Sequence, residues 1–373
     1  MNARHYELAI VGGGLVGMAL AFGLRGLGSR LAVLDEDDRA RRASRGNFGL
    51  VWVQGKGMGM PGYASWTQRS AREWPRLAAD LAQETGIDVA LRQPGGLHLC
   101  MSRDELDRRV ALFDRLFAQP GFERYDLDVL DHAGVARRVA GLGPDVAGGT
   151  YAPCDGDCNP LALFRALHQA VGRAGCRYRP DSTVESLEPR GTAFRLRTRQ
   201  GIVTASRVVL AAGLGNARLA PMVGLAAPVT PNKGHILVLE RVPKLLSLPI
   251  ETLRQTDDGT VLIGDSQQAG GSDRWLDPAI MAAMAARAVA ALPQLAGARV
   301  VRAWAALRVM SPDSFPIYDA SRAHPGAFVA TCHSGVTLAA VHAHVLAPAI
   351  AAGRVADECR PYSADRFDVR AAA

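Results

Sequence analysis

The sequence predicts an α/β fold with two lobes, and three observations support this prediction. Residues 7–34 show an apolar strand, a glycine-rich turn, a helix and a second apolar strand. Two further apolar strands that run into glycines occur at 207–213 and 327–335, and a β-rich stretch at 229–264 separates them. We therefore expect a Rossmann-like domain that is discontinuous in sequence, with a mixed β-sheet inserted into it. The length of 373 residues agrees with two lobes, because one domain usually holds ~100–150 residues.

The composition is that of a globular protein, with 48% hydrophobic and 21% charged residues. The 43 Lys and Arg against 36 Asp and Glu leave a net charge of +7. The arginines are scattered singly or in pairs, so we expect no nucleic-acid partner. No signal peptide and no apolar run of about 18 residues is evident, which favours a cytoplasmic protein without a transmembrane segment, attached to the inner membrane only through partners. The six cysteines are dispersed and Cys154–Cys158 is the only close pair, so we expect no metal centre.

The first unit is a βαβ motif. Strands are expected at Glu7–Val11 and Arg30–Leu34, with a helix at Met18–Leu27 between them. The second strand ends in Asp35. A right-handed crossover should make the two strands parallel neighbours.

The later elements follow from hydrophobic periodicity and turn residues. Helices are expected at 69–85, 104–117, 160–175 and 278–292, and a glycine-containing turn followed by a helix is expected over 334–352. Strands are expected at 194–198, 202–204, 207–212, 235–240, 251–255, 260–264, 304–307 and 327–331.

The glycine turn at 12–17 satisfies G-x-G-x-x-G between a strand and a helix, with an acid at the tip of the next strand. Gly12 permits the tight turn, Gly14 lets the backbone approach a pyrophosphate, and Gly17 lets the helix pack close to the sheet. Asp35 would accept hydrogen bonds from a ribose 2′-hydroxyl, which argues against NADP. The motif therefore predicts a dinucleotide site. The alternative is a glycine-rich βα turn that binds nothing.

The choice between NAD and FAD depends on later segments. Ser44–Leu50 places small and polar residues just past the second strand, where the second half of a long dinucleotide would lie. Two more strand-to-glycine junctions occur at 210–213 and 330–337. A nicotinamide domain normally needs one such turn, whereas three converging turns suit a large buried cofactor. We therefore expect FAD.

Several segments resemble the FAD-dependent amine and amino-acid oxidoreductases, the family of D-amino acid oxidase, glycine oxidase and sarcosine oxidase. The resemblance runs nearly end to end and is carried by residues 12–17, 44–50, 155–160, 208–213, 231–236, 304–317 and 330–337. Within that family, three stretches are most similar to the catalytic β subunits of D-hydroxyproline dehydrogenase and opine oxidase complexes. These are Arg254–Thr256, Gly264–Gln267 and Thr331–His342.

This resemblance implies a glutathione-reductase-type FAD-binding domain made of residues 1–85, 150–222 and 305–373. The substrate-binding domain would comprise 86–149 and 223–304. Sarcosine oxidases attach flavin through a cysteine after the late Trp segment, and 308–315 contains none, so non-covalent FAD is expected. The chain departs from the family's Arg-Gly-Gln at 233–235, where it has Lys-Gly-His. Lys233 and His235 could gate substrate or oxygen, or simply face solvent.

The fingerprint and the resemblance together identify the expected cofactor-binding residues. They are Gly12, Gly14, Leu15, Val16, Gly17, Asp35, Glu36, Ser44, Arg45, Asn47, Gly49, Leu50, Val184, Ala212, Gly213, Arg308, His333, Ser334, Gly335, Val336 and Thr337.

Arg308 and His333 are the expected catalytic residues. By resemblance to glycine oxidase-like members, Arg308 would hold the substrate carboxylate, for which a planar guanidinium is well suited. The alternative is a surface arginine or an internal salt bridge. His333 precedes the last helix and would either stabilise negative charge on the reduced flavin or merely pack there.

The function expected is FAD-dependent oxidation of an amino acid's secondary amine, as in D-hydroxyproline or an opine, to the imine by hydride transfer to flavin N5. The electrons would pass to an acceptor other than oxygen, through other subunits of a dehydrogenase complex. One alternative is a stand-alone oxidase of glycine or D-amino acids that produces hydrogen peroxide. Another is a non-catalytic FAD-binding subunit, and pure NAD chemistry is a more distant one.

Overall fold

A mixed eight-stranded sheet forms the centre of one lobe in the computed structural model, which describes residues 4–37, 43–264, 266–270 and 273–367. β1 (Arg4–Val11) lies between β2 (Leu31–Leu34) and β11 (Gly201–Leu210), parallel to both. The order is β17-β18-β11-β1-β2-β8, with β10 and β9 added beside β11. The remaining strands are β8 (Arg177–Arg179), β9 (Val184–Arg190), β10 (Ala193–Thr198), β17 (Ile317–Ala320) and β18 (Ala327–Thr331).

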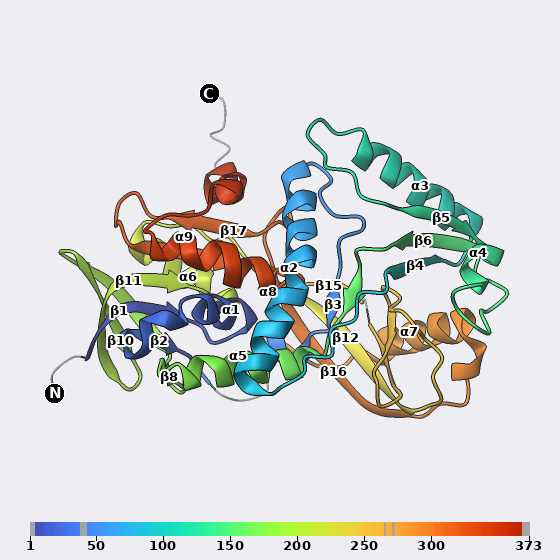
Figure 1. Ribbon diagram of the computed structural model, residues 1–373, viewed down its shortest axis with the longest axis horizontal. Helices are drawn as coiled ribbons and strands as arrows, with labels where there is room; N and C mark the ends of the chain where they lie inside the picture. The colour runs from blue at the N-terminus through green and yellow to red at the C-terminus, as the bar shows by residue number, and fades with distance from the viewer. Residues whose placement is uncertain (1–3, 38–42, 265, 271–272, 368–373) are drawn as a thin grey trace.

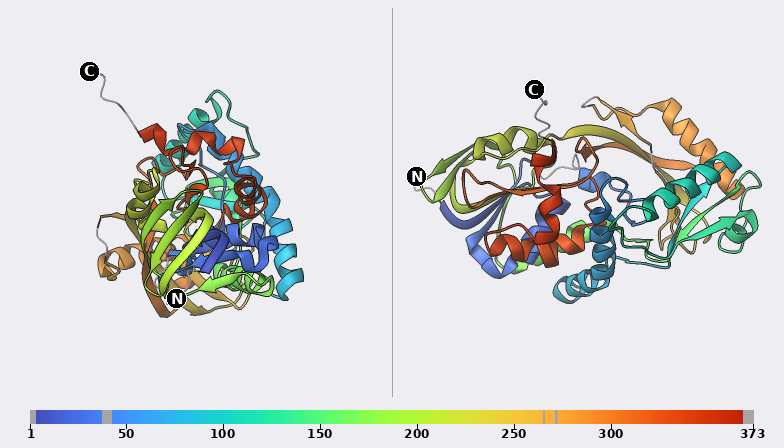
Figure 2. Two further views of the ribbon diagram at one scale, coloured as in Figure 1. Left: turned by 90° about the vertical axis from the view of Figure 1, so that its left-hand side faces the viewer. Right: turned by 90° about the horizontal axis from the view of Figure 1, so that it is seen from above.

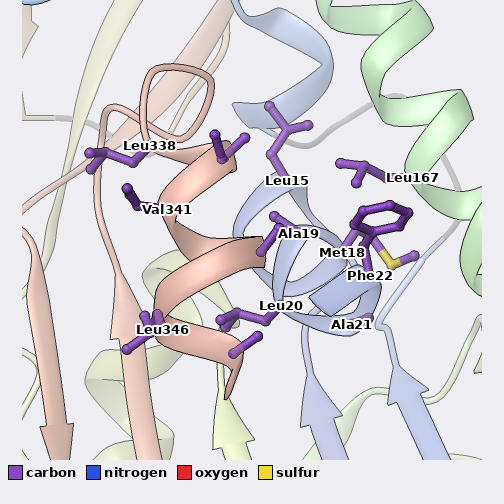
Figure 3. Close-up of a cluster of buried hydrophobic side chains, with 14 of the residues drawn as sticks. Leu15, Met18, Ala19, Leu20, Ala21, Phe22, Leu167, Leu338, Val341 and Leu346 are labelled. Atoms are coloured by element: carbon purple, nitrogen blue, oxygen red, sulfur yellow. The ribbon is translucent and has the colours of Figure 1, made fainter. Parts of the chain in front are cut away.

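Helices from both ends of the chain cover one face of this sheet. α1 (Leu15–Gly23) packs against α5 (Pro160–Arg173) on one side and against the C-terminal helical segment on the other (Figure 3). That segment comprises α8 (Ala339–Val341), a π-helical turn (His342–Leu346) and α9 (Ala347–Ala351). In Figure 3 the side chain of Leu20 lies on the side of α1 that faces this C-terminal segment. Residues more than 300 positions apart thus share one core.

The long helix α2 (Pro61–Thr85) stands between the two lobes (Figure 1). Trp74 of this helix is fully buried, and its Nε1 donates to the carbonyl oxygens of Val336 and Thr337 at 3.2 and 3.1 Å. Ser70 Oγ also donates to the Thr337 carbonyl at 2.6 Å. α2 therefore holds in place the turn that follows β18.

The second lobe contains two smaller sheets. A five-stranded sheet has β12 (Thr230–Arg241) paired with β14 (Thr260–Ile263), β15 (Gln268–Ala269) and β16 (Val300–Met310), while β13 (Leu253–Gln255) pairs with β14. A three-stranded sheet consists of β4 (Gly96–Cys100), β6 (Gly148–Ala152) and β5 (Asp128–Asp131). A parallel bridge between Leu97 and Ile250 connects the two.

Helices surround these sheets. α3 (Arg103–Phe117) and α7 (Pro278–Ala291) lie at the same end of the molecule, far from β1 (Figures 1 and 2). Other short elements are β3 (Leu50–Val51), α4 (His132–Ala136), β7 (Gly156–Asp157) and α6 (Asn216–Leu219).

The α/β fold with an inserted mixed sheet is confirmed, and most expected elements are present. The predicted 18–27 helix is wrong at both ends, because α1 starts at Leu15 and stops at Gly23. The predicted 69–85 helix starts at Pro61 instead, since a proline in the first turn loses no hydrogen bond. The β4–β6 sheet was not predicted. The domain limits remain a prediction, and those at 150 and 304/305 fall within β6 and β16.

The turn and the helix expected over 334–352 are both present, but the helix is interrupted. Residues 334–338 form a turn in which Leu338 N–H donates to the Ser334 carbonyl at 3.0 Å, and regular helix begins only at Ala339. A π-helical turn then interrupts the helix before Pro348. Proline has no N–H to continue the ladder, so the helix restarts as α9 with Pro348 in its first turn.

Candidate active site

The glycine turn after β1 is sterically restricted to glycine at two positions. Gly12 has φ +109°, and a Cβ on it would lie 2.3 Å from the Ala211 carbonyl oxygen. A Cβ on Gly17 would lie 1.9 Å from the Gly12 carbonyl oxygen. Side chains at either position would separate α1 from the sheet, so the helix N-terminus approaches the strand ends closely only because both residues are glycine.

Asp35 lies at the end of β2 beside this turn and is 5% exposed. Its Oδ2 accepts a hydrogen bond from Gly13 N–H at 2.7 Å, and Ser44 Oγ accepts one from Leu15 N–H at 2.8 Å. The turn, the acid and the start of α1 therefore form one polar unit at the carboxyl ends of the parallel strands, where α/β folds bind nucleotides.

A cavity of about 350 Å³, here called cavity 1, opens over this unit. Thirteen of the expected cofactor residues line it, which are Gly12, Gly14, Leu15, Val16, Asp35, Glu36, Ser44, Asn47, Val184, Ala212, Gly213, His333 and Gly335. Residues that were not predicted also line it, among them Thr183, Arg218, Arg274 and Leu307.

A second cavity of about 310 Å³, here called cavity 2, adjoins the first and extends under the five-stranded sheet. Seven expected residues line it, namely Asn47, Leu50, Arg308, His333, Ser334, Val336 and Thr337. The two cavities share lining residues, which are Ala43, Asn47, Val309, Cys332 and His333. Together they could accommodate a long cofactor with a substrate at one end.

Three expected residues line neither cavity. Gly17 lies beneath the turn, as described above. Gly49 has φ +96°, and a Cβ there would lie 2.6 Å from the Cys158 carbonyl oxygen. The guanidinium of Arg45 lies over the Phe164 ring, 5.5 Å from its centroid. The direct cofactor contacts expected of these three remain predictions.

Arg308 projects from β16 into cavity 2. Its Nη1 donates to the Ser266 carbonyl at 2.7 Å and to Asn232 Oδ1 at 3.3 Å. The guanidinium packs against Gly234 of β12, where a Cβ would lie 2.5 Å from Nη1. Glycine at 234 therefore makes room for the arginine.

His333 borders both cavities and contacts Ser334, whose Oγ lies 3.3 Å from its Nε2. Burial, together with the charges of Lys56 and Arg308, lowers the pKa of His333 to about 3. His333 is therefore neutral at neutral pH. It can exchange hydrogen bonds with a ligand but does not supply a positive charge.

Lys233 and His235 do not face solvent, being 6% and 1% exposed. Lys233 Nζ donates to Asp273 Oδ1 at 3.0 Å and is absent from the lining of cavity 2. His235 does line cavity 2, and its Nε2 accepts from Asp277 N–H at 3.2 Å, which leaves the ring proton on Nδ1, 2.9 Å from Ser266 Oγ. Burial and neighbouring cations lower the pKa of His235.

Sequence reasoning missed Lys56 and Glu251, both of which line cavity 2. Burial lowers the pKa of Lys56 to about 8. One available signal was that Lys56 is among only three lysines in the chain and stands between two glycines. Glu251 had no local signal, because its position depends on a contact with β4, where its N–H donates to the Leu97 carbonyl at 2.9 Å.

The residues around both cavities fit a flavin dinucleotide. The glycine turn and the first turn of α1 would hold its phosphates, Asp35 its ribose, and the turn at 332–335 its ring system. Within the described ranges, no group of three or more His, Cys, Asp and Glu side chains could hold a metal ion.

Comparison with known proteins decides the family. The family model "FAD dependent oxidoreductase" (DAO) matches residues 7–349.

The chain belongs to this family.

It is 44% identical over 366 residues to the B subunit of opine oxidase from Rhizobium meliloti, covering 98% of this chain and 99% of the relative. It is 26% identical over 372 residues to the glycine oxidase of Geobacillus kaustophilus, covering 97% of each chain. The crystal structure of that glycine oxidase superposes with a TM-score of 0.87, covering 97% of this chain and 98% of the other. L-proline dehydrogenase of P. horikoshii has the same fold, with a TM-score of 0.80 at 17% identity, covering 99% of this chain and 100% of the other.

This protein is therefore an FAD-dependent amino-acid oxidoreductase that acts on amine donors. In the part of the chain that the structure describes, no helix combines the length and the apolar character needed to cross a bilayer.

Proposed function

We propose that this FAD-dependent oxidoreductase oxidises a secondary amine of an amino acid, of the opine type, and transfers the electrons to an acceptor other than oxygen. The observation that carries the proposal is the position of Arg308 in cavity 2, which shares His333 with the cofactor cavity. The 44% identity to the B subunits of two opine oxidases, over nearly the whole chain, favours the opine class over a primary amino acid.

An opine contains a secondary amine between two α-carbons, each of which bears a carboxylate. Bound FAD would supply the two-electron acceptor: hydride leaves the α-carbon, the N–H proton is released, and a C=N bond forms. Water would then hydrolyse the imine to a primary amino acid and a 2-oxo acid. The chain's own task is to bind the neutral amine and orient its α-carbon.

Arg308 would orient the substrate through its carboxylate. The Ser266 carbonyl and Asn232 Oδ1 hold Nη1 in place, so the guanidinium is pre-positioned at the cavity wall. A fixed arginine can form two parallel charge-assisted hydrogen bonds to a carboxylate. His333 would favour binding of the neutral form of the substrate amine. Its own ring is neutral, so it adds no charge to the cavity, and it can accept or donate a hydrogen bond.

Partner subunits would carry the electrons onward. Both relatives at 44% identity are named as one subunit of an opine oxidase, which supports assembly of this chain with other subunits. All six cysteines are free thiols, and this supports a reducing compartment such as the cytoplasm.

Anaerobic reduction of the bound flavin by a substrate panel tests the reaction. The panel comprises opines, D-hydroxyproline, N-methyl amino acids, D-amino acids and glycine. We expect opines to bleach the flavin most efficiently, with Arg308→Ala retaining FAD but losing this bleaching. If glycine or a primary D-amino acid reduces the flavin and no secondary amine does, the proposed substrate class is wrong.

The similarity to glycine oxidase in sequence and structure makes a peroxide-forming oxidase the second candidate. Turnover in air separates the two. The proposal predicts slow peroxide release by the isolated chain and fast turnover with an artificial electron acceptor. Rapid formation of one peroxide per amine oxidised would identify an oxidase instead.

A further inference from the structure

Lys56 presents a second cation to the cavity that contains Arg308. It lies between β3 and α2 and lines cavity 2 on the side of Ser334, whose Oγ accepts a hydrogen bond from its Nζ at 3.1 Å. The ammonium also lies 5.8 Å from the centroid of the Tyr63 ring. Both contacts are to neutral groups.

The acidic groups near Lys56 already have other partners. Glu251 forms an ion pair with His98. Burial alone would raise the pKa of Glu251, but this bond and the charges of His98, Arg109 and Arg287 hold it below its ordinary value. Across the described ranges, no carboxylate lies within ion-pair distance of Lys56.

Asp155 is also unsuited to neutralise Lys56. Its Oδ1 accepts from Val53 N–H and from Gln54 N–H, the latter at 3.3 Å, and its Oδ2 accepts from Gln54 Nε2 at 2.8 Å. Burial raises the pKa of Asp155 to about 7 despite these bonds. Lys56 therefore has no carboxylate paired directly with it at the cavity, although the charges of Asp155 and Glu251 favour its protonated form, and a ligand anion could bind it directly.

Lys56, Arg308 and His333 line the same cavity. Each of the two cations exerts a charge effect on His333, so neither cation is remote from it. Two cations that line one cavity match a ligand with two anionic groups.

We propose that Lys56 binds the second carboxylate of an N-carboxyalkyl amino acid whose first carboxylate is held by Arg308. This inference rests on the proposed function and deepens it, since it names the residue that would recognise the second carboxylate of the opine. Lys56 would then determine specificity, because a secondary amine with only one carboxylate would leave the lysine charge in cavity 2 without a partner.

Equilibrium binding to the oxidised holoenzyme tests Lys56 without requiring turnover. Diglycolate has two carboxylates joined through an ether oxygen, so it cannot be oxidised as an amine, and methoxyacetate is its counterpart with one carboxylate. Perturbation of the flavin absorbance reports the binding of each ligand. We expect wild-type protein to bind diglycolate roughly 10- to 100-fold more tightly than methoxyacetate.

The variants isolate the charge of Lys56. Lys56→Met should abolish the preference for diglycolate, and Lys56→Arg should restore most of it. Lys244→Met is the matched control, because Lys244 is exposed and lies outside both cavity linings; it should keep the full preference. Lys56→Gln provides a second uncharged variant if Lys56→Met does not fold.

Three results would overturn the inference. The first is an unchanged preference for diglycolate in Lys56→Met. The second is an equal loss of affinity for diglycolate and methoxyacetate in that variant. The third is a loss of FAD affinity in that variant with the preference for diglycolate intact, which would assign Lys56 to the cofactor. Failure of the proposed function looks different. In that case wild-type protein prefers diglycolate, yet no secondary amine reduces its flavin.

Discussion

Replacing Gly234 with alanine should displace Arg308 without unfolding the protein. Gly234 lies on β12 directly beneath the guanidinium, and its backbone is not in the left-handed region. Alanine is therefore compatible with the strand. The added Cβ would lie 2.5 Å from Nη1, 2.7 Å from Cζ and 2.8 Å from Nη2 of Arg308.

The size of the effect follows from these distances. Ordinary van der Waals contact begins near 3.4 Å, so the guanidinium must move by about 1 Å. The end of a flexible side chain can move this far, but the movement strains the bond of Nη1 to the Ser266 carbonyl. A misplacement of about 1 Å in a group that positions substrate costs roughly 100-fold in rate. That corresponds to about 2.7 kcal/mol of activation free energy.

Anaerobic stopped-flow reduction of the flavin by the best amine substrate measures the loss. We expect kcat/KM for reduction to fall roughly 100-fold in Gly234→Ala, with FAD still bound at full occupancy. Gly172→Ala in α5 is the control, because a Cβ there meets nothing within 4 Å. An unchanged kcat/KM in Gly234→Ala would refute the assignment of Arg308 to the substrate carboxylate. Loss of FAD would refute the packing argument.

Three further predictions concern the cofactor turn and a buried histidine. Gly17→Ala should release FAD on dialysis, because its Cβ would lie 1.9 Å from the Gly12 carbonyl oxygen, and flavin absorbance after dialysis checks this. Asp35→Ala should weaken FAD binding roughly 10- to 100-fold, since Gly13 N–H loses its acceptor, as measured by flavin fluorescence titration; unchanged affinity would exclude this role. Burial lowers the pKa of His342 from 6.5 to about 3, so the unfolded chain binds a proton that the folded chain does not as pH falls through 6.5. The free energy of unfolding should therefore drop by about 1.4 kcal/mol between about pH 7.5 and about pH 5.5 through this residue, and His342→Gln should remove that part in urea titrations.

The cofactor turn could be predicted from sequence because its requirements are local. Gly12, Gly14 and Gly17 lie within six residues and meet constraints on one turn and one helix start. Asp35 follows from the end of the next strand. Hairpins could be predicted from sequence for the same reason. In the hairpin of β10 and β11, for example, two runs of alternating residues flank a short turn.

Elements that depend on distant contacts could not be predicted this way. The β4–β6 sheet joins strands up to 56 positions apart in register, with Gly96 opposite Ala152, and neither strand has a strong alternating pattern. The π-helical turn at His342–Leu346 likewise arises inside a segment whose apolar pattern suits a continuous helix.

The sequence by itself determined the nucleotide fold, the FAD family and most residues of the cofactor turn, because these depend on short-range sterics and hydrogen bonding. Only the tertiary structure brought Lys56 to Ser334 and Arg308 to Gly234 and Ser266, and buried His235 on β12. Those contacts join segments 42 to 278 positions apart. The charged side chains that line a cavity depend on which distant segments of the chain come together there. A local sequence pattern does not predict such long-range contacts.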